Sequence, residues 1–215
     1  MKYAIFSDIQ GNYPKLESFL ESTISENIDK FICLGDLTQH GTDFNDNRCI
    51  DALKKLEGIV ISGNHEEEIL KNKKESLKKI SLANLDFIKS LPSKFLLENK
   101  YLLTHKALSS ISNNGRIRSA QDMQKESEFL AAQYPNVQMC FSGHSHKAFL
   151  FEYDPNKYCM KKLFEGHDLF GKMFNLDNKK HYLANPGGIG LYYNLPTSYL
   201  IFDTTENSIK FKLIK

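Results

Sequence analysis

Strand-like and helix-like segments alternate over the first 61 residues, and this order restricts the fold more than any other feature of the chain. Apolar, β-prone runs predict strands, whereas apolar side chains that repeat at helical spacing predict amphipathic helices. Strands joined by helical crossovers form a parallel sheet with the helices packed outside it. The predicted strands cover residues 3–7, 30–34 and 58–61, and the predicted helices cover about 12–26 and 46–56.

Polar side chains follow each of these strands directly. Asp8 comes after the first strand, Asp36 after the second, and Asn64 and His65 after the third. Ligands of open α/β sheets bind beyond the carboxyl ends of the strands. We therefore expect these side chains to meet at one edge of the sheet and to form part of a functional site.

The rest of the chain continues as a lysine-rich helix and then becomes mostly β. The helix is expected over about residues 66–90, and a further helix at about 118–134. Strands are expected at about 94–98, 100–104, 137–141, 148–153, 159–165, 171–175, 180–184, 198–203 and 208–214. The last half should close a second sheet, and without an internal repeat or linker we expect one domain, residues 1–215, of α/β (α+β) class.

Composition and charge exclude several classes of protein. The 28 basic and 26 acidic residues nearly balance, so a broad surface for nucleic acid is not expected. No apolar run is long enough to cross a membrane, and we expect no signal peptide. The cysteines are scattered and form no C-x-x-C pair, which favours a reducing compartment and a cytoplasmic location.

Imidazole groups follow two of the later strands. His105 comes after the strand at 100–104, and His144 and His146 come after the strand at 137–141. Alone, an aspartate after a strand often caps a turn, and a lone histidine is often an ordinary surface or core residue. Together, carboxylate, imidazole and amide groups suit divalent manganese, iron, zinc, cobalt or nickel. The residues that converge in this way are Asp8, Gln10, Asp36, Asn64, His65, His105, His144 and His146.

Several short motifs occur in the order found in one known family. They are Asp8-Ile9-Gln10, Gly35-Asp36, Gly63-Asn64-His65-Glu66, His105 and Gly143-His144-Ser145-His146. In this order they resemble D-x-H, G-D, G-N-H-[DE], H and G-H-x-H of the calcineurin-like metallophosphoesterases. Residues 7–12 and 185–190 resemble the compact bacterial and archaeal branch of that family, which includes phosphodiesterases and phosphatases.

The resemblance implies a fold and a set of roles. The fold would be two mixed β-sheets packed as a sandwich and flanked by helices. His65 and Asn64 would be the catalytic residues, with His65 as a general acid or phosphate contact. A metal-activated water at a dinuclear site would attack phosphorus. The two divalent metal ions would be held by Asp8, Gln10, Asp36 and His146 and by Asp36, Asn64, His105 and His144, with Asp36 as the bridge.

Gln10 departs from the family pattern, which usually has histidine at this position. An amide oxygen binds a metal more weakly than imidazole does, so Gln10 would weaken the first site or change its metal preference. Alternatively, Gln10 forms a hydrogen bond with a metal-bound water and costs little affinity.

The stretch after Asp36 departs as well. Many phosphatases of the superfamily carry G-D-x-V-D-R-G, whose arginine holds phosphate, but here His40 stands at the arginine position. His40 either contacts the substrate or belongs to a surface loop. Tyr192 and Tyr193 follow the last motif and either stack on a ring of the substrate or pack within a β segment.

These observations favour a metal-dependent phosphoesterase for a small or nucleotide-like phosphodiester or phosphomonoester. The alternative is a non-catalytic binding or scaffold protein on the same fold, because some relatives have lost metal ligands and serve as interaction proteins. A nuclease would need a track of basic side chains along the nucleic-acid backbone. The chain could supply such a track, but a solvated helix face is the more expected role of the lysines in this region. They are Lys71, Lys73, Lys74, Lys78 and Lys79.

Overall fold

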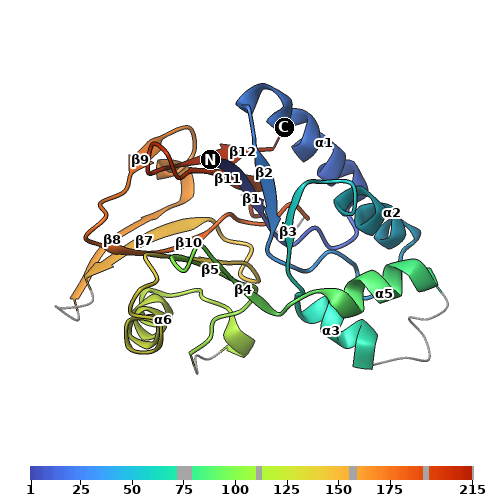
Figure 1. Cartoon of the computed structure of the whole chain (residues 1–215), viewed down its shortest axis with the longest axis horizontal. Helices are drawn as coiled ribbons and strands as arrows, with labels where there is room; N and C mark the ends of the chain where they lie inside the picture. Colours follow the sequence, from blue (N-terminus) through green and yellow to red (C-terminus); the bar gives the residue numbers. More distant parts are fainter. Residues whose placement is uncertain (72–78, 110–112, 155–158, 191–193, 215) are drawn as a thin grey trace.

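Two β-sheets pack face to face, and helices cover the outer face of each (Figure 1). The structure is a computed structural model, which describes residues 1–71, 79–109, 113–154, 159–190 and 194–214. One sheet has the strand order β3-β2-β1-β11-β12-β9, and the other has the order β4-β5-β6-β10-β7-β8. This arrangement confirms the predicted sandwich of two mixed sheets flanked by helices.

The first sheet combines strands from both ends of the chain. As predicted, β1, β2 and β3 are parallel, whereas β11 pairs antiparallel with β1. The expectation that the last half only closes a second sheet is wrong, because β9, β11 and β12 extend the first one. An open edge at β1 would leave backbone groups unpaired, and β11 pairs with them. The strands are β1 (Lys2–Phe6), β2 (Lys30–Cys33), β3 (Gly58–Val60), β9 (Met173–Asn175), β11 (Ser198–Asp203) and β12 (Ser208–Leu213).

The second sheet has a parallel centre and antiparallel edges. β6 lies between β5 and β10 and is parallel to both, while β4 and β7 pair antiparallel with their neighbours. The carboxyl ends of β5 and β6 therefore lie at the same edge. The strands are β4 (Lys94–Leu97), β5 (Tyr101–Thr104), β6 (Met139–Ser142), β7 (Phe149–Asp154), β8 (Cys159–Glu165) and β10 (His181–Asn185).

The helices begin at recognisable caps. Asn12 accepts a hydrogen bond from the backbone N of Lys15 at 3.2 Å and starts α1, as predicted. The single helix expected over 66–90 is wrong, because Ser81 caps a new helix through the backbone N of Asn84 at 3.2 Å. None of the described helices is long and apolar enough to span a membrane. The helices are α1 (Tyr13–Thr23), α2 (Phe44–Leu53), α3 (Asn64–Lys71), α5 (Leu82–Ser90) and α6 (Ala120–Gln133), with short 3₁₀ turns η1 (Ile24–Glu26), η2 (Asn113–Gly115) and η3 (Gly166–Asp168).

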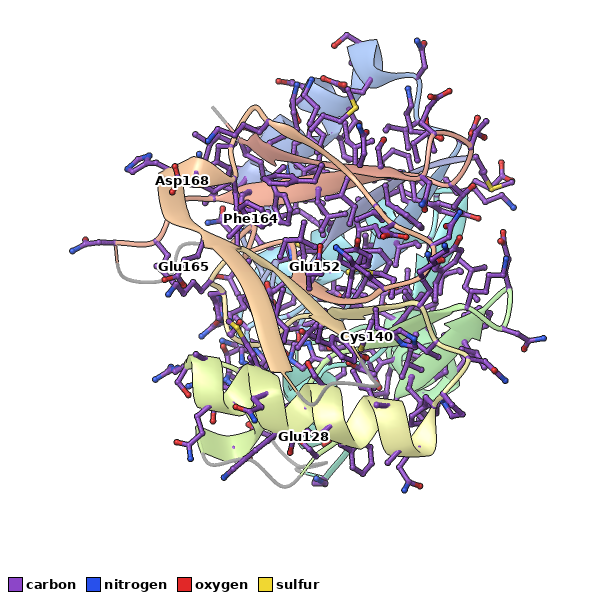
Figure 2. All side chains as sticks on the ribbon, turned by 90° about the vertical axis from the view of Figure 1, so that its left-hand side faces the viewer. Glu128, Cys140, Glu152, Phe164, Glu165 and Asp168 are labelled. Atoms are coloured by element: carbon purple, nitrogen blue, oxygen red, sulfur yellow. The ribbon has the colours of Figure 1, made fainter. Side chains whose placement is uncertain are left out.

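The core is layered because side chains alternate across each strand. In β1, Tyr3 and Ile5 pack between the two sheets, while Ala4 and Phe6 pack on the helical side. Figure 2 shows Phe164 between the sheets and Cys140 on the side of β6 that faces α6, in agreement with their clusters. Both sheets are thus buried on two faces. The loops at the strand ends lie outside this layered core and can carry a functional site.

Candidate metal centre

The loops after the strands adopt an unusual backbone conformation at the predicted site residues. Non-glycine residues avoid positive φ, and clusters of such residues occur at functional sites, where the surrounding structure holds them. This conformation turns the chain in the loops that follow β1, β2 and β6. The residues are Asp8 (54°), Gln10 (50°), Asp36 (53°), His40 (55°), His144 (64°) and His146 (57°).

Backbone hydrogen bonds join these loops. Asp8 N donates to Gly35 O at 3.0 Å, and Gln10 N donates to Asp36 O at 2.9 Å, so the loops after β1 and β2 run side by side. The loop after β6 joins them, because His144 N donates to Asp8 Oδ2 at 3.0 Å. Residues from both sheets therefore meet at one edge of the sandwich.

One group of side chains surrounds Asp36. Single ligand atoms of Asp36, His105 and His144 all lie within 4.8 Å of one another, and all three residues are buried. His105 Nε2 lies 3.3 Å from Asp36 Oδ1 and 3.1 Å from Asn64 Oδ1. The structure thus brings together the residues expected at the second metal, and these donors suit a borderline divalent cation.

A second group surrounds Asp8. His146 Nε2 lies 3.4 Å from Asp8 Oδ1, and Gln10 Nε2 lies 3.2 Å from the same imidazole nitrogen. Asp8 Oδ1 is buried and accepts no hydrogen bond from the described residues. A buried carboxylate oxygen without a donor is costly, and a cation would satisfy it. The residues expected at the first metal therefore also fit one.

In the group around Asp36, the electrostatics resemble those of an ion pair. Burial alone would raise the pKa of Asp36, but His105 and His65 outweigh it and hold this pKa well below its usual range. Burial opposes the charged form of His105, yet Asp36 raises the pKa of His105 to about 9. Because metal ligands bind without their protons, a cation here would displace the proton that His105 holds beside Asp36.

The other imidazole and carboxylate groups are shifted by burial. Burial, helped by the charges of His105 and Arg116, lowers the pKa of His144 to about 3. Burial also lowers the pKa of His146 and raises the pKa of Asp8. The two histidines are therefore neutral at physiological pH, which is the form that binds a metal.

His65 lies beside the Asp36 group. Its Nδ1 donates to Thr38 O at 2.6 Å, and its Nε2 lies 3.5 Å from Asp36 Oδ2. The backbone N of His65 also donates to Asp36 Oδ1 at 3.0 Å. His40, the predicted substrate contact, stacks on His65 with a distance of 3.6 Å between ring centroids. Both residues therefore lie at the same site.

Sequence reasoning missed the role of Glu66. Its buried carboxylate accepts hydrogen bonds from the backbone N of Asp36, Leu37, Thr38 and Gly63 and from the Thr38 hydroxyl, at 2.9–3.2 Å. Glu66 thus holds the loop that carries Asp36. A side chain at Gly63 would collide with Asp36, which explains the glycine. The fourth position of the G-N-H-[DE] motif was the available signal.

Two further buried carboxylates hold neighbouring loops. Glu126 in α6 accepts hydrogen bonds from the backbone N of Leu108 and of Ser109, both at 2.8 Å. Asp46 in α2 accepts one from the backbone N of Gln39 at 2.6 Å. No motif pointed to Glu126, because its partners lie 17 and 18 residues away in the chain.

A cavity of about 160 Å³ opens beside Asn64 and His105. Lys94 and Lys106 contribute to its walls. Lys94 Nζ donates to the hydroxyl of Tyr134 at 2.9 Å, which restrains this lysine. Tyr192, Tyr193, Lys73, Lys74 and Lys78 lie outside the described residues.

The family model for calcineurin-like phosphoesterases matches residues 1–148. The chain belongs to the calcineurin-like phosphoesterase family. Membership, together with the group around Asp36, supports a metal-dependent phosphoesterase, a hydrolase that acts on phosphoester bonds.

One similar sequence and two similar solved structures match nearly the whole of this chain. The uncharacterized protein MJ0912 of Methanocaldococcus jannaschii is 28% identical over 99% of this chain and 86% of its own. A metallophosphoesterase from Sphaerobacter thermophilus superposes with a TM-score of 0.76 at 19% identity, covering 100% of this chain and 88% of its own. The hypothetical protein PH1004 from Pyrococcus horikoshii OT3 gives a TM-score of 0.70 at 16% identity, with coverages of 100% and 88%.

Proposed function

We propose that this protein hydrolyses a small phosphodiester or phosphomonoester at a dinuclear metal site. The observation that carries the proposal is the meeting of two buried ligand groups, around Asp36 and around Asp8, at one edge of the sandwich. Two divalent cations bound there would activate water and neutralise charge on the phosphoryl group. The first would be held by Asp8, Gln10, Asp36 and His146, and the second by Asp36, Asn64, His105 and His144.

His65 is proposed to contact the reacting group. Its Nδ1 carries the hydrogen, because the carbonyl of Thr38 can only accept. Nε2 is therefore the atom left to take up a second proton, with which it would contact a phosphoryl oxygen or protonate the leaving oxygen. Its position, 3.5 Å from Asp36 Oδ2, keeps it next to the proposed metals.

The cavity beside Asn64 and His105 supports a small anionic substrate. Its volume of about 160 Å³ accommodates a small group, and Lys94 and Lys106 outnumber the carboxylate of Glu67 in its walls, which favours a negatively charged group. Manganese, iron, zinc, cobalt and nickel all suit the donors. The free, buried thiols of Cys33, Cys49 and Cys140 support the proposed cytoplasmic location.

A metal-by-substrate panel tests the proposal. Metal-free protein should be inactive on bis-p-nitrophenyl phosphate, p-nitrophenyl phosphate and nucleotides, and manganese, nickel, cobalt or zinc should restore turnover of at least one. In the restored enzyme, His65→Ala should lower kcat about 10²-fold, because a positioned proton donor or phosphate contact is lost. Absence of turnover with every metal and every substrate would contradict the proposal and favour a binding protein.

Gln10→His is expected to tighten the first metal site about tenfold, because imidazole replaces an amide beside His146. Calorimetric titration of metal-free protein with Mn²⁺ measures the two affinities separately. Unchanged affinity would instead support the reading in which Gln10 acts through a hydrogen bond to water.

A further inference from the structure

The ring of His65 is restrained on one edge and on one face. At the edge, Nδ1 donates to Thr38 O at 2.6 Å. On the face, the His40 ring lies with 3.6 Å between centroids and 25° between planes. These two contacts restrain the ring in an orientation in which Nε2 lies 3.5 Å from Asp36 Oδ2.

The His40 ring is itself restrained by Glu68. His40 Nδ1 lies 2.9 Å from Glu68 Oε2, which is an ion-pair contact. Glu68 lies one helical turn after His65 on α3. The same helix therefore carries the His65 ring and the carboxylate that contacts His40. His40 and Gly41 lie in a turn and both have positive φ, 55° and 73°.

Burial does not explain the fixed orientation of the His40 and Glu68 side chains. The side chains of His40 and Glu68 are 38% and 51% exposed, whereas the His65 side chain is 8% exposed. An exposed imidazole samples several orientations unless specific contacts restrict it. The stack and the carboxylate contact are the contacts that do so.

We propose that Glu68 and His40 are positioning residues, which hold the His65 ring in the orientation that presents Nε2 to the phosphoester. The inference rests on the proposed role of His65. A positioning role of His40 can be distinguished from direct substrate binding. Stacking on His65 requires only a flat ring, whereas substrate binding requires a ring nitrogen.

Steady-state kinetics of four variants test the inference. His40→Ala and Glu68→Ala should lower kcat about tenfold, since a misplaced catalytic group loses much of its effect. KM should stay within about twofold, because the uniform binding of the substrate is not altered. His40→Phe keeps a flat ring and Glu68→Gln keeps an acceptor oxygen, so both should retain kcat within about threefold.

Two combinations sharpen the test. In the His40→Phe background, Glu68→Ala should have no further effect, because the carboxylate no longer has an imidazole to hold. Glu128→Ala removes an exposed carboxylate of α6 that accepts a hydrogen bond from Gln124, and it is the matched control with unchanged kinetics. Figure 2 shows Glu128 on α6, at the far side of the second sheet.

Ring-nitrogen NMR of the metal-free protein gives a readout that does not depend on turnover. The His65 signals, assigned among the seven histidines with His65→Ala, should report the Nδ1–H form in the wild type and in His40→Phe. In His40→Ala they should report a mixture of both forms. Thermal melts should show that all variants remain folded, as expected for exposed side chains.

The outcomes separate this inference from the proposed function. If His65→Ala leaves kcat unchanged, the role of His65 fails, and the inference fails with it. If His65→Ala lowers kcat but His40→Ala does not, only the inference is wrong. A loss in His40→Phe as large as in His40→Ala, or a loss confined to KM, would show that the His40 nitrogen contacts the substrate and would also overturn it.

Discussion

Asp36→Asn is expected to lower kcat for phosphoester hydrolysis on the order of 10³-fold, because the group around which the site is built loses its charge. Asp36 is 1% exposed and lies 3.3 Å from His105 and 3.5 Å from His65. Its carboxylate is the proposed bridge between two cations. An amide of the same shape offers one oxygen and no charge, so the repulsion between the cations would be left uncompensated.

Hydrolysis of bis-p-nitrophenyl phosphate with saturating Mn²⁺ measures this effect. Metal binding gives a second readout, because a ligand at a hundredfold excess over its Kd stabilises the folded state by about 2.7 kcal/mol. Mn²⁺ should therefore raise the melting temperature of the wild type more than that of the variant. Asp86→Asn is the control, since Asp86 is exposed and pairs with Lys89 at 2.7 Å. Activity of Asp36→Asn within tenfold of the wild type would contradict the proposed bridge.

Glu66→Ala is expected to reduce the free energy of unfolding by about 4 kcal/mol, because each buried donor left without an acceptor costs about 1–3 kcal/mol. Four backbone N–H groups and one hydroxyl would lose their acceptor, and water entering the space would recover part of the loss. Activity should fall as well, since the backbone N of Asp36 donates to Glu66 Oε2 at 2.9 Å.

Urea unfolding at constant m-value measures the change in stability. Glu66→Gln should fall between the wild type and Glu66→Ala, because the amide keeps one acceptor oxygen and puts a donor where the other oxygen was. Glu67→Ala is the matched control on the same helix, where Glu67 is exposed and pairs with Lys71 at 3.7 Å, and it should change stability by less than about 0.5 kcal/mol. A decrease of less than about 1 kcal/mol in the free energy of unfolding of Glu66→Ala would contradict the proposed role, because the Asp36 loop would then be stable without the carboxylate.

The position of the proposed ligand residues was predictable because it depends on short-range patterns. Apolar runs marked β1, β2 and β3, and the crossovers between them made the strands parallel. Parallel strands end at one edge, so polar residues directly after them had to meet there. The motif order added His105, His144 and His146, which the structure places beside Asp8 and Asp36.

The pairing of distant strands was not predictable in this way. β11 reads as an ordinary apolar strand, and its sequence does not state that Leu200 pairs with Ile5 rather than with a residue of the second sheet. Likewise, the pattern of 66–90 fits a helix throughout, but the cap at Ser81 begins α5 as a new helix. The partner and register of a strand depend on which sheet edge has unpaired backbone groups and which face has apolar side chains to bury.

By itself, the sequence determined which residues stand at strand ends and which chemistry they offer, since both follow from neighbours along the chain. Only the tertiary structure decided how those residues are held. Glu66 and Glu68 lie two residues apart on α3, yet Glu66 is buried under the Asp36 loop, whereas Glu68 contacts His40, whose ring stacks on His65. The reason is physical: a carboxylate acquires its role from the donors around it, and those donors come from loops that only folding brings together.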